Sequence, residues 1–233
     1  MVHDDIFRRF AQAVLPPSLS TSSMSNIQSL ASQICVARGD MAHLDEEAMR
    51  YIVFLSQGAA KLVSHVGVDR EQIVAFAFEG DLLVLSGAAD ASYALYCLTD
   101  CRLLSFPADK FFDAVAGSSD AAKAIFDHSL RAIDRSREKS VLLGRKTAQE
   151  RIATFLTSIA ERIGEPIGES ISLTLPMSRR EIADSLGLTI ETVSRNLTEL
   201  RETNLISVSG RSQIIILDVQ RMRELAALTP CPA

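Results

Sequence analysis

The sequence is poor in cysteine, and its four cysteines do not form closely spaced pairs. Zinc and iron-sulfur sites usually need such pairs, so the sequence predicts no metal site. Cys97 and Cys101 lie four apart in an apolar, strand-like segment, where they are expected to face the same side; a redox role for either stays open. We expect all four to be small, buried, hydrophobic side chains in a reducing compartment: Cys35, Cys97, Cys101 and Cys231.

Long apolar runs and catalytic motifs are also missing. No run approaches the roughly 18 to 20 apolar residues of a membrane-spanning helix, and residues 1–10 lack the apolar core of a signal peptide. The sequence contains no Ser-His-Asp arrangement, Gly-rich phosphate loop or His-Glu-x-x-His motif. We therefore expect a cytoplasmic protein that has no membrane partner and is not an enzyme.

The chain has no overall basic excess, since its net charge is -5. Residues 1–144 hold 13 of the 24 Lys and Arg but 18 of the 29 Asp and Glu, so the acid excess lies there and residues 145–233 are neutral. A neutral domain can bind nucleic acid where its basic side chains cluster. Such a cluster lies in or near residues 177–197, and its members are Arg179, Arg180, Arg195, Arg201 and Arg211.

The remaining sequence indicates an α+β chain with more than one domain, because 233 residues exceed one typical domain and 47% are apolar. Residues 1–25 are expected to form a short helix and a flexible Ser/Thr-rich connection. Residues 26–118 contain short apolar runs between Gly/Asp turns, which predict an antiparallel β-barrel or jelly-roll that closes on itself to bury its edges. The expected strands are residues 33–36, 51–57, 61–66, 71–78, 82–85, 91–98 and 101–106.

A long helix is expected next, over residues 119–144. Its apolar stripe is wider than one seam, because Phe126, Leu130 and Ile133 lie beside a heptad-like row of smaller residues. This width predicts that one side covers the barrel and the other meets a partner helix. The candidate dimerisation residues are Ala122, Ile125, Ser129, Ala132, Ile133 and Ser136.

The clearest local signals lie in residues 177–197. Ser178 followed by Glu181 predicts a capping box at a helix start, and Gly187 predicts its end. Thr189 is expected to cap a second helix, so that the two helices form a helix-turn-helix. Apolar strands at residues 205–208 and 213–217 flank a Ser-Gly turn, which predicts a hairpin and completes a winged helix over residues 145–233.

Three residues of the second helix are expected to face outward and contact DNA bases. Arg195 can donate two hydrogen bonds to a guanine, Glu191 can accept one from a cytosine, and Ser194 can contact a thymine. Other residues are candidates for phosphate contacts, which set the register without specifying sequence. These candidates are Arg179, Arg180, Thr189, Arg211 and Ser212.

This order of elements resembles the CRP/FNR transcription regulators over about residues 25–225. The resemblance is carried by residues 175–183, by residues 186–195 with their Glu-x-x-Ser-Arg spacing, and by Gly210-Arg211, which are similar to the FixK-type branch. The first domain matches chiefly at Gly39, Gly58 and Gly80-Asp81.

Two departures from the family concern the signal that the protein senses. No cysteine precedes Cys35, whereas the iron-sulfur members carry several near the N-terminus. Ala91-Ser92 stands where cAMP-binding members have Arg-Ser, so a bound phosphodiester would lack its charged partner. We therefore expect neither the cluster nor cyclic nucleotide, and no resident cofactor. A ligand- or haem-responsive sensor is the alternative, with four candidate axial ligands: His3, His43, His65 and His128.

The resemblance implies a homodimer that binds a palindrome near TTGAT-N4-ATCAA. Two second helices related by a dyad would lie about 34 Å apart, one turn of DNA. It also implies RNA polymerase as a partner and an activating role, although the residues themselves leave activator and repressor open. Control by a ligand in the barrel and control by abundance alone both remain compatible with the sequence.

Overall fold

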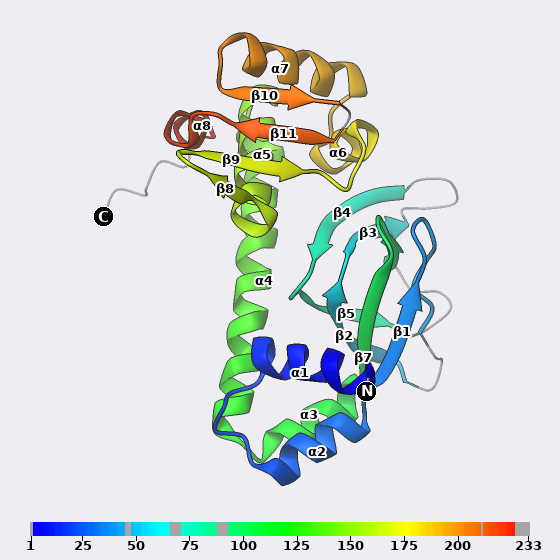
Figure 1. Cartoon of the computed structure of the whole chain (residues 1–233). Coiled ribbons are helices and arrows are strands. Elements are labelled where there is room, and N and C mark those ends of the chain that lie inside the picture. Colours follow the sequence, from blue (N-terminus) through cyan, green and yellow to red (C-terminus); the bar gives the residue numbers. More distant parts are fainter. Residues whose placement is uncertain (1, 45–47, 66–70, 88–92, 211, 227–233) are drawn as a thin grey trace. The chain divides into compact units, whose positions relative to one another are not determined.

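The computed structural model describes residues 2–44, 48–65, 71–87, 93–210 and 212–226 (Figure 1). The chain divides into two compact units, Met1–Arg135 and Ser136–Ala233, and each is described by itself. None of the described helices combines the length and the apolar character that a membrane crossing needs.

The first unit contains the predicted strands and the helices around them. The elements are α1 (Val2–Val14), α2 (Thr21–Ser29), β1 (Ser32–Val36), β2 (Arg50–Gln57), β3 (Ala59–His65), β4 (Glu71–Phe78), β5 (Leu82–Ser86), β6 (Tyr93–Cys97), β7 (Cys101–Pro107), α3 (Ala108–Ala116) and α4 (Ser119–Arg145), whose last residues belong to the second unit. All seven expected strands are present, with bounds that differ by one or two residues; Val66 and Ala91-Ser92 lie outside the described residues.

The strands form two antiparallel sheets, one in the order β1-β7-β2-β5 and one in the order β4-β3-β6. Among the described strands, the ladders do not join into one closed barrel, so the fold is a jelly-roll-like pair of sheets. The turn from β2 to β3 requires glycine, because Gly58 has a φ of 99°. A Cβ there would lie 2.5 Å from the carbonyl oxygen of Asp100.

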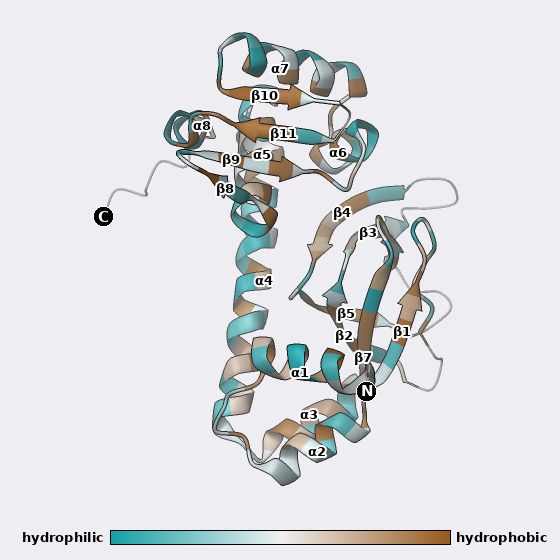
Figure 2. Cartoon of the chain, viewed as in Figure 1, coloured by the Kyte–Doolittle hydropathy of each residue, from teal (hydrophilic) through white to brown (hydrophobic). Residues whose placement is uncertain are grey.

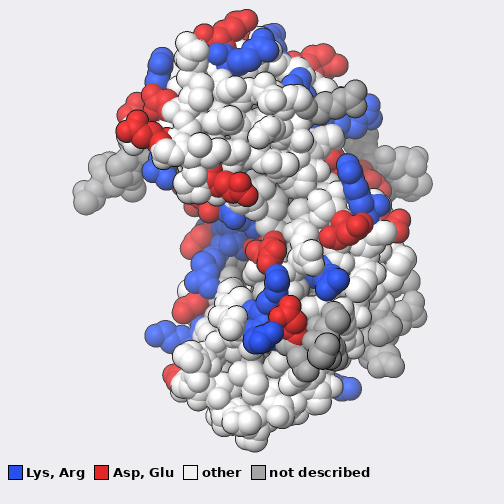
Figure 3. Space-filling view, viewed as in Figure 1, with Lys and Arg blue, Asp and Glu red and all other residues white. Residues whose placement is uncertain are grey.

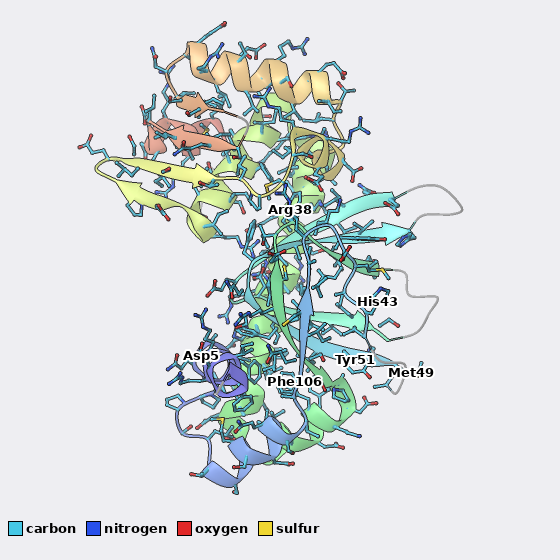
Figure 4. All side chains as sticks on the ribbon, turned by 45° about the vertical axis from the view of Figure 1, so that its right-hand side comes forward. Asp5, Arg38, His43, Met49, Tyr51 and Phe106 are labelled. Atoms are coloured by element: carbon cyan, nitrogen blue, oxygen red, sulfur yellow. The ribbon has the colours of Figure 1, made fainter. Side chains whose placement is uncertain are left out.

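Strand β2 is buried on both faces, and its alternate side chains enter two different cores. Ile52 and Phe54 pack with α1 and α3 in one cluster, to which β7 contributes Phe106 (Figure 4). Val53 and Leu55 point the other way, into the cluster between the two sheets. The interior of the jelly roll is therefore filled by apolar side chains: Val36, Tyr51, Val53, Leu55, Ala60, Ala77, Leu85, Leu95, Cys97, Cys101 and Leu103.

The Ser/Thr-rich segment is helical from Thr21 onward, within α2, so the prediction of a flexible connection was wrong. Ser20 caps α2 by accepting a hydrogen bond from the Ser23 backbone N–H at 3.1 Å. Ile27 is fully buried, and Met24 packs against the same core. Helix propensity in this segment is low, and burial of these apolar side chains outweighs it.

Helix α4 buries one side within the first unit and exposes another. Ala121 and Ile125 lie in the core, so Ile125 is unavailable for the dimer contact predicted for it. Phe126, Leu130 and Ile133 are 61%, 42% and 46% exposed, and their spacing of four and three places them on one face. Figure 2 shows hydrophilic and hydrophobic residues alternating along α4.

The second unit is a winged helix. After the last residues of α4 it contains α5 (Ala148–Ile163), β8 (Glu165–Ile167), β9 (Ser170–Thr174), α6 (Arg179–Leu186), α7 (Ile190–Glu202), β10 (Ile206–Ser209), β11 (Gln213–Ile216) and α8 (Val219–Leu225). The sheet has the order β10-β11-β9-β8. Strand β8 was not predicted, because its three residues form a strand only by pairing with β9.

Candidate nucleic-acid interface

Helices α6 and α7 begin and end at the residues that the sequence indicated. Ser178 and Glu181 form a capping box, in which the Ser178 hydroxyl accepts from the Glu181 N–H and the Glu181 carboxylate accepts from the Ser178 N–H. Gly187 then has a φ of 61° and a ψ of 42°, the left-handed conformation that glycine tolerates best. Thr189 caps α7 by accepting from the Thr192 N–H at 3.2 Å.

The two sides of α7 differ sharply in burial. Val193, Leu197 and Leu200 are buried and hold the helix on its domain. Glu191 and Arg195 are exposed, and Ser194 is half-buried beside them. Their spacing of three and four places all three on one helical face, together with exposed Thr198. This face is therefore free of the packing that fixes the opposite side.

The charged side chains Glu191 and Arg195 on this face are accessible to solvent. The backbone N–H at the start of α7, followed by the Thr189 hydroxyl, lowers the pKa of the Glu191 carboxyl below its ordinary value. The Arg195 side chain is 72% exposed, and its Nε lies 3.8 Å from the Glu199 Oε1. An exposed pair at that distance contributes little, so the guanidinium can rearrange toward a base at low cost.

Some of the residues predicted to contact phosphates lie beside the exposed face of α7. Arg179 and Arg180 are exposed, and the Arg179 Nη1 donates to the Ser194 Oγ at 3.4 Å, which brings a candidate phosphate contact onto a candidate base contact. Thr189 is exposed but already caps α7. Ser212 is exposed beside β11, and Arg211 lies outside the described residues.

The wing follows as a two-stranded hairpin. Strands β10 and β11 pair from Ile206 with Ile216 to Ser209 with Gln213. Gly210 in the turn has a φ of 65°, which suits a tight connection. Ile206, Ile214 and Ile216 are buried, so the hairpin is fixed to the domain by its apolar face.

Charge over α7 is mixed rather than uniformly basic. The space-filling view in Figure 3 shows acidic and basic side chains interspersed over this helix. A mixed surface provides both hydrogen-bond donors and acceptors, as selective contact with base edges requires. The acidic side chains weaken the general, sequence-independent attraction to phosphates.

Sequence reasoning did not predict the roles of Asn196 and Arg151. Asn196 is buried in α7, where its Nδ2 donates to the Thr192 carbonyl at 2.9 Å. Arg151 lies near the start of α5 and donates to three carbonyls. A cation near a helix N-terminus opposes the helix dipole, and this was the available sign of a special role for Arg151.

The histidines considered as axial ligands come from separate elements. His43 is exposed (Figure 4), and the His65 Nε2 lies 3.4 Å from the Glu71 Oε1. His128 contacts the Ala13 carbonyl at 3.3 Å, and burial lowers its pKa. The side chain of His3 lies outside the described residues. Within the described part of the chain, no three His, Cys, Asp or Glu residues form a group that could hold a metal.

Cys97 and Cys101 do not share a strand, which corrects the expected arrangement. Cys97 ends β6 and Cys101 begins β7, in different sheets, and both are buried in the core between those sheets. A hydrogen bond from Cys97 lowers the pKa of the Cys101 thiol to about 7, and the same bond raises the pKa of Cys97. Cys35 is exposed, so the expectation that it is buried was wrong, and Cys231 lies outside the described residues.

A helix-turn-helix followed by a wing, on a chain that also carries a jelly-roll-like domain and a long helix, defines a DNA-binding transcription regulator. Residues 150–225 match the Crp-like helix-turn-helix domain. The chain is 32% identical over 200 residues to the nitrogen fixation regulation protein FixK of Azorhizobium caulinodans, covering 85% of this chain and 81% of that protein. This chain therefore belongs to the CRP/FNR family and is a FixK-like regulator.

Two further comparisons agree with this family. The transcriptional activator protein FnrL of Cereibacter sphaeroides is 31% identical over 185 residues, covering 77% of this chain and 74% of that protein. The solved structure of FixK2 from Bradyrhizobium japonicum has a TM-score of 0.72 and 29% identity, covering 87% of this chain and 99% of that one. The relatives are transcription regulators rather than enzymes.

Proposed function

We propose that this regulator binds as a homodimer to a palindrome near TTGAT-N4-ATCAA and activates transcription in the cytoplasm, with RNA polymerase as its partner. The observation that carries this proposal is the shared face of α7, on which Glu191, Ser194 and Arg195 lie together at one surface. The same three residues form the Glu-x-x-Ser-Arg pattern from which the half-site was expected.

The chemistry of the three side chains fits the proposed half-site. TTGAT contains one G·C pair, and its guanine presents the O6 and N7 acceptors that suit the Arg195 guanidinium. An ionised Glu191 can accept from a cytosine N4 amino group, and the lowered pKa of Glu191 keeps it ionised. Ser194 can contact a thymine, of which the TTGAT strand has three.

The exposed face of α4 supports a dimer. Phe126, Leu130 and Ile133 present large apolar side chains on one side of a long helix. A second copy of the same helix would cover this face and bury it from water. A dimer also supplies two copies of α7, as a palindrome requires.

An activating role is supported by the relatives. FnrL of Cereibacter sphaeroides is described as a transcriptional activator protein, and the match to it covers 77% of this chain. An activator must engage RNA polymerase, so we assign the polymerase as partner on that basis. Transcription in vitro from a promoter bearing the palindrome should rise when the protein is added.

The base contacts are tested with an Arg195→Ala variant. We expect this variant to lose discrimination at the G·C pair of TTGAT, at a cost of about 1 to 3 kcal/mol, because the bidentate contact to guanine is removed. Titration of labelled palindromes with and without a substitution at that pair measures the discrimination.

Arg221→Ala is the matched control, because it removes one exposed arginine from α8 rather than α7. This control should preserve the wild-type preference. Full retention of the preference by Arg195→Ala would contradict the assignment of Arg195, and equal affinity of the wild-type protein for unrelated DNA would contradict the proposed half-site.

A further inference from the structure

Arg151 contacts the ends of two other helices. Its Nε donates at 3.0 Å to the carbonyl of Lys146, just after α4, and its Nη2 donates at 2.8 Å to the carbonyl of Leu143, in the last turn of α4. Its Nη1 donates to the Leu186 carbonyl at 3.0 Å, at the last residue of α6. One half-buried guanidinium on α5 therefore joins the end of α4 to the end of the first helix of the helix-turn-helix.

The side chains around Arg151 continue this junction. A Cβ added at Gly187 would lie 3.8 Å from both the Arg151 Nη1 and the Leu143 Cδ2, so the turn after α6 packs on the end of α4. Lys139, one turn before Leu143, lies near enough to Asp184 of α6 for the carboxylate to raise its pKa, although burial lowers it overall. All of these residues belong to the second unit.

A neighbouring lysine extends the pattern to a third helix end. The Lys146 Nζ donates to the Ala226 carbonyl at 2.6 Å, just after α8, and to the Thr154 Oγ1 at 2.8 Å. The last carbonyls of a helix lack partners within that helix, and two cations supply partners here. The helices at this junction are therefore joined by directional hydrogen bonds from two cationic side chains to backbone carbonyls.

The Arg151 guanidinium fixes the angle between α4 and α6 in a way that a lysine ammonium cannot. The five N–H donors of the guanidinium point in fixed directions in one plane. Three of these directions are occupied by carbonyls, one in the last turn of α4, one just after α4 and one at the end of α6. A lysine ammonium would keep the charge but not this planar arrangement. Movement of α6 relative to α4 would break at least one of the three hydrogen bonds.

We propose that Arg151 is a positioning residue that sets the angle between α4 and the helix-turn-helix, and thereby the spacing at which two half-sites are bound. This inference rests on the proposed function, because the angle matters only if α4 forms the dimer and α7 contacts DNA. Each base pair added between the half-sites rotates one relative to the other by about 35°. A fixed angle between α4 and the helix-turn-helix therefore disfavours palindromes whose half-sites are not separated by four base pairs.

The test compares palindromes whose half-sites are separated by three, four and five base pairs. Wild-type protein should prefer the N4 spacer by about tenfold or more. Arg151→Met should bind the three spacers within about threefold of one another, because the carbonyl contacts that fix α6 are gone. It should keep its preference for TTGAT over a half-site changed at the G·C pair, since α7 is unaltered.

Arg223→Met is the control, because Arg223 is an exposed arginine of the same unit that pairs only at 3.5 Å with Glu161. It should keep the wild-type spacer preference. Circular dichroism melting establishes that each variant is folded at the assay temperature. If Arg151→Met is unfolded there, Arg151→Lys serves instead and should show a reduced preference.

The outcomes separate this inference from the proposed function. A folded Arg151 variant with the wild-type spacer preference would overturn the role of Arg151. A parallel loss of spacer preference and base preference would also overturn it, since this would indicate general loosening of the domain. Failure of the wild-type protein to prefer any palindrome would instead count against the proposed half-site.

Discussion

At the residue scale, Lys139 carries an electrostatic cost in the folded chain. Burial lowers the pKa of its ammonium from 10.5 to about 8, and the Asp184 carboxylate opposes this shift only in part. Below pH 8 the group is charged in both states, and folding must desolvate it. Between pH 8 and 10.5 the folded state releases the proton while the unfolded state keeps it, so this group makes stability rise with pH.

Substitution of this lysine should therefore change the pH dependence of stability. We expect Lys139→Met to remove a rise of about 1 to 2 kcal/mol between pH 8 and 10.5, after allowance for solvent screening. Urea unfolding at several pH values in that window measures the difference from wild type. Lys110→Met, at an exposed position of α3, is the control and should leave the slope unchanged. A wild-type slope in Lys139→Met would contradict the cost assigned to Lys139.

At the element scale, α4 has one face that is buried in the core and another apolar face that is exposed. Ala121 and Ile125 anchor it to the core, while Phe126, Leu130 and Ile133 remain exposed. Substitutions on the exposed face should therefore affect association without affecting the fold of the chain. This separation makes the proposed dimer testable by single changes.

We expect Leu130→Glu to convert the proposed dimer to a monomer, because a carboxylate at the centre of the proposed apolar contact would be desolvated and would face its own copy. Light scattering at micromolar concentration measures the mass. Arg135→Glu, exposed on another face of the same helix, is the matched control and should remain dimeric. A dimeric Leu130→Glu would show that this face is not the interface.

At the scale of the whole molecule, the jelly-roll interior bears on how the regulator is controlled. Apolar side chains from both sheets fill it, including Val53, Leu95 and Leu103. Since apolar side chains there offer no partner to a charged ligand, we propose that this regulator binds DNA without an effector. Its activity would then follow its abundance.

The effector-free protein should accordingly bind the proposed palindrome with nanomolar affinity at physiological salt, in the range of specific regulators. Fluorescence anisotropy with purified protein measures this affinity, and addition of cyclic AMP should not change it. Micromolar binding that is equal for specific and unrelated DNA would instead indicate that an effector is required.

The sequence by itself determined the elements that depend on local signals. Ser178, Glu181 and Gly187 specify the ends of α6 through capping and backbone conformation, which act over a few residues. The outward face of α7 follows from the helical period, which separates Val193 and Leu197 from the residues that face solvent. The expected strands follow in the same way from short apolar runs between turns.

Only the tertiary structure decided what depends on distant partners. Helix α2 forms because Ile27 finds a core, and β8 forms because β9 pairs with it. Ile125 belongs to the core rather than to the exposed apolar face of α4, because α1 and α3 pack in the same cluster. The role of Arg151 depends on carbonyls up to 35 residues away in the chain. Local periodicity specifies which face of an element is apolar, but the fold determines what that face meets.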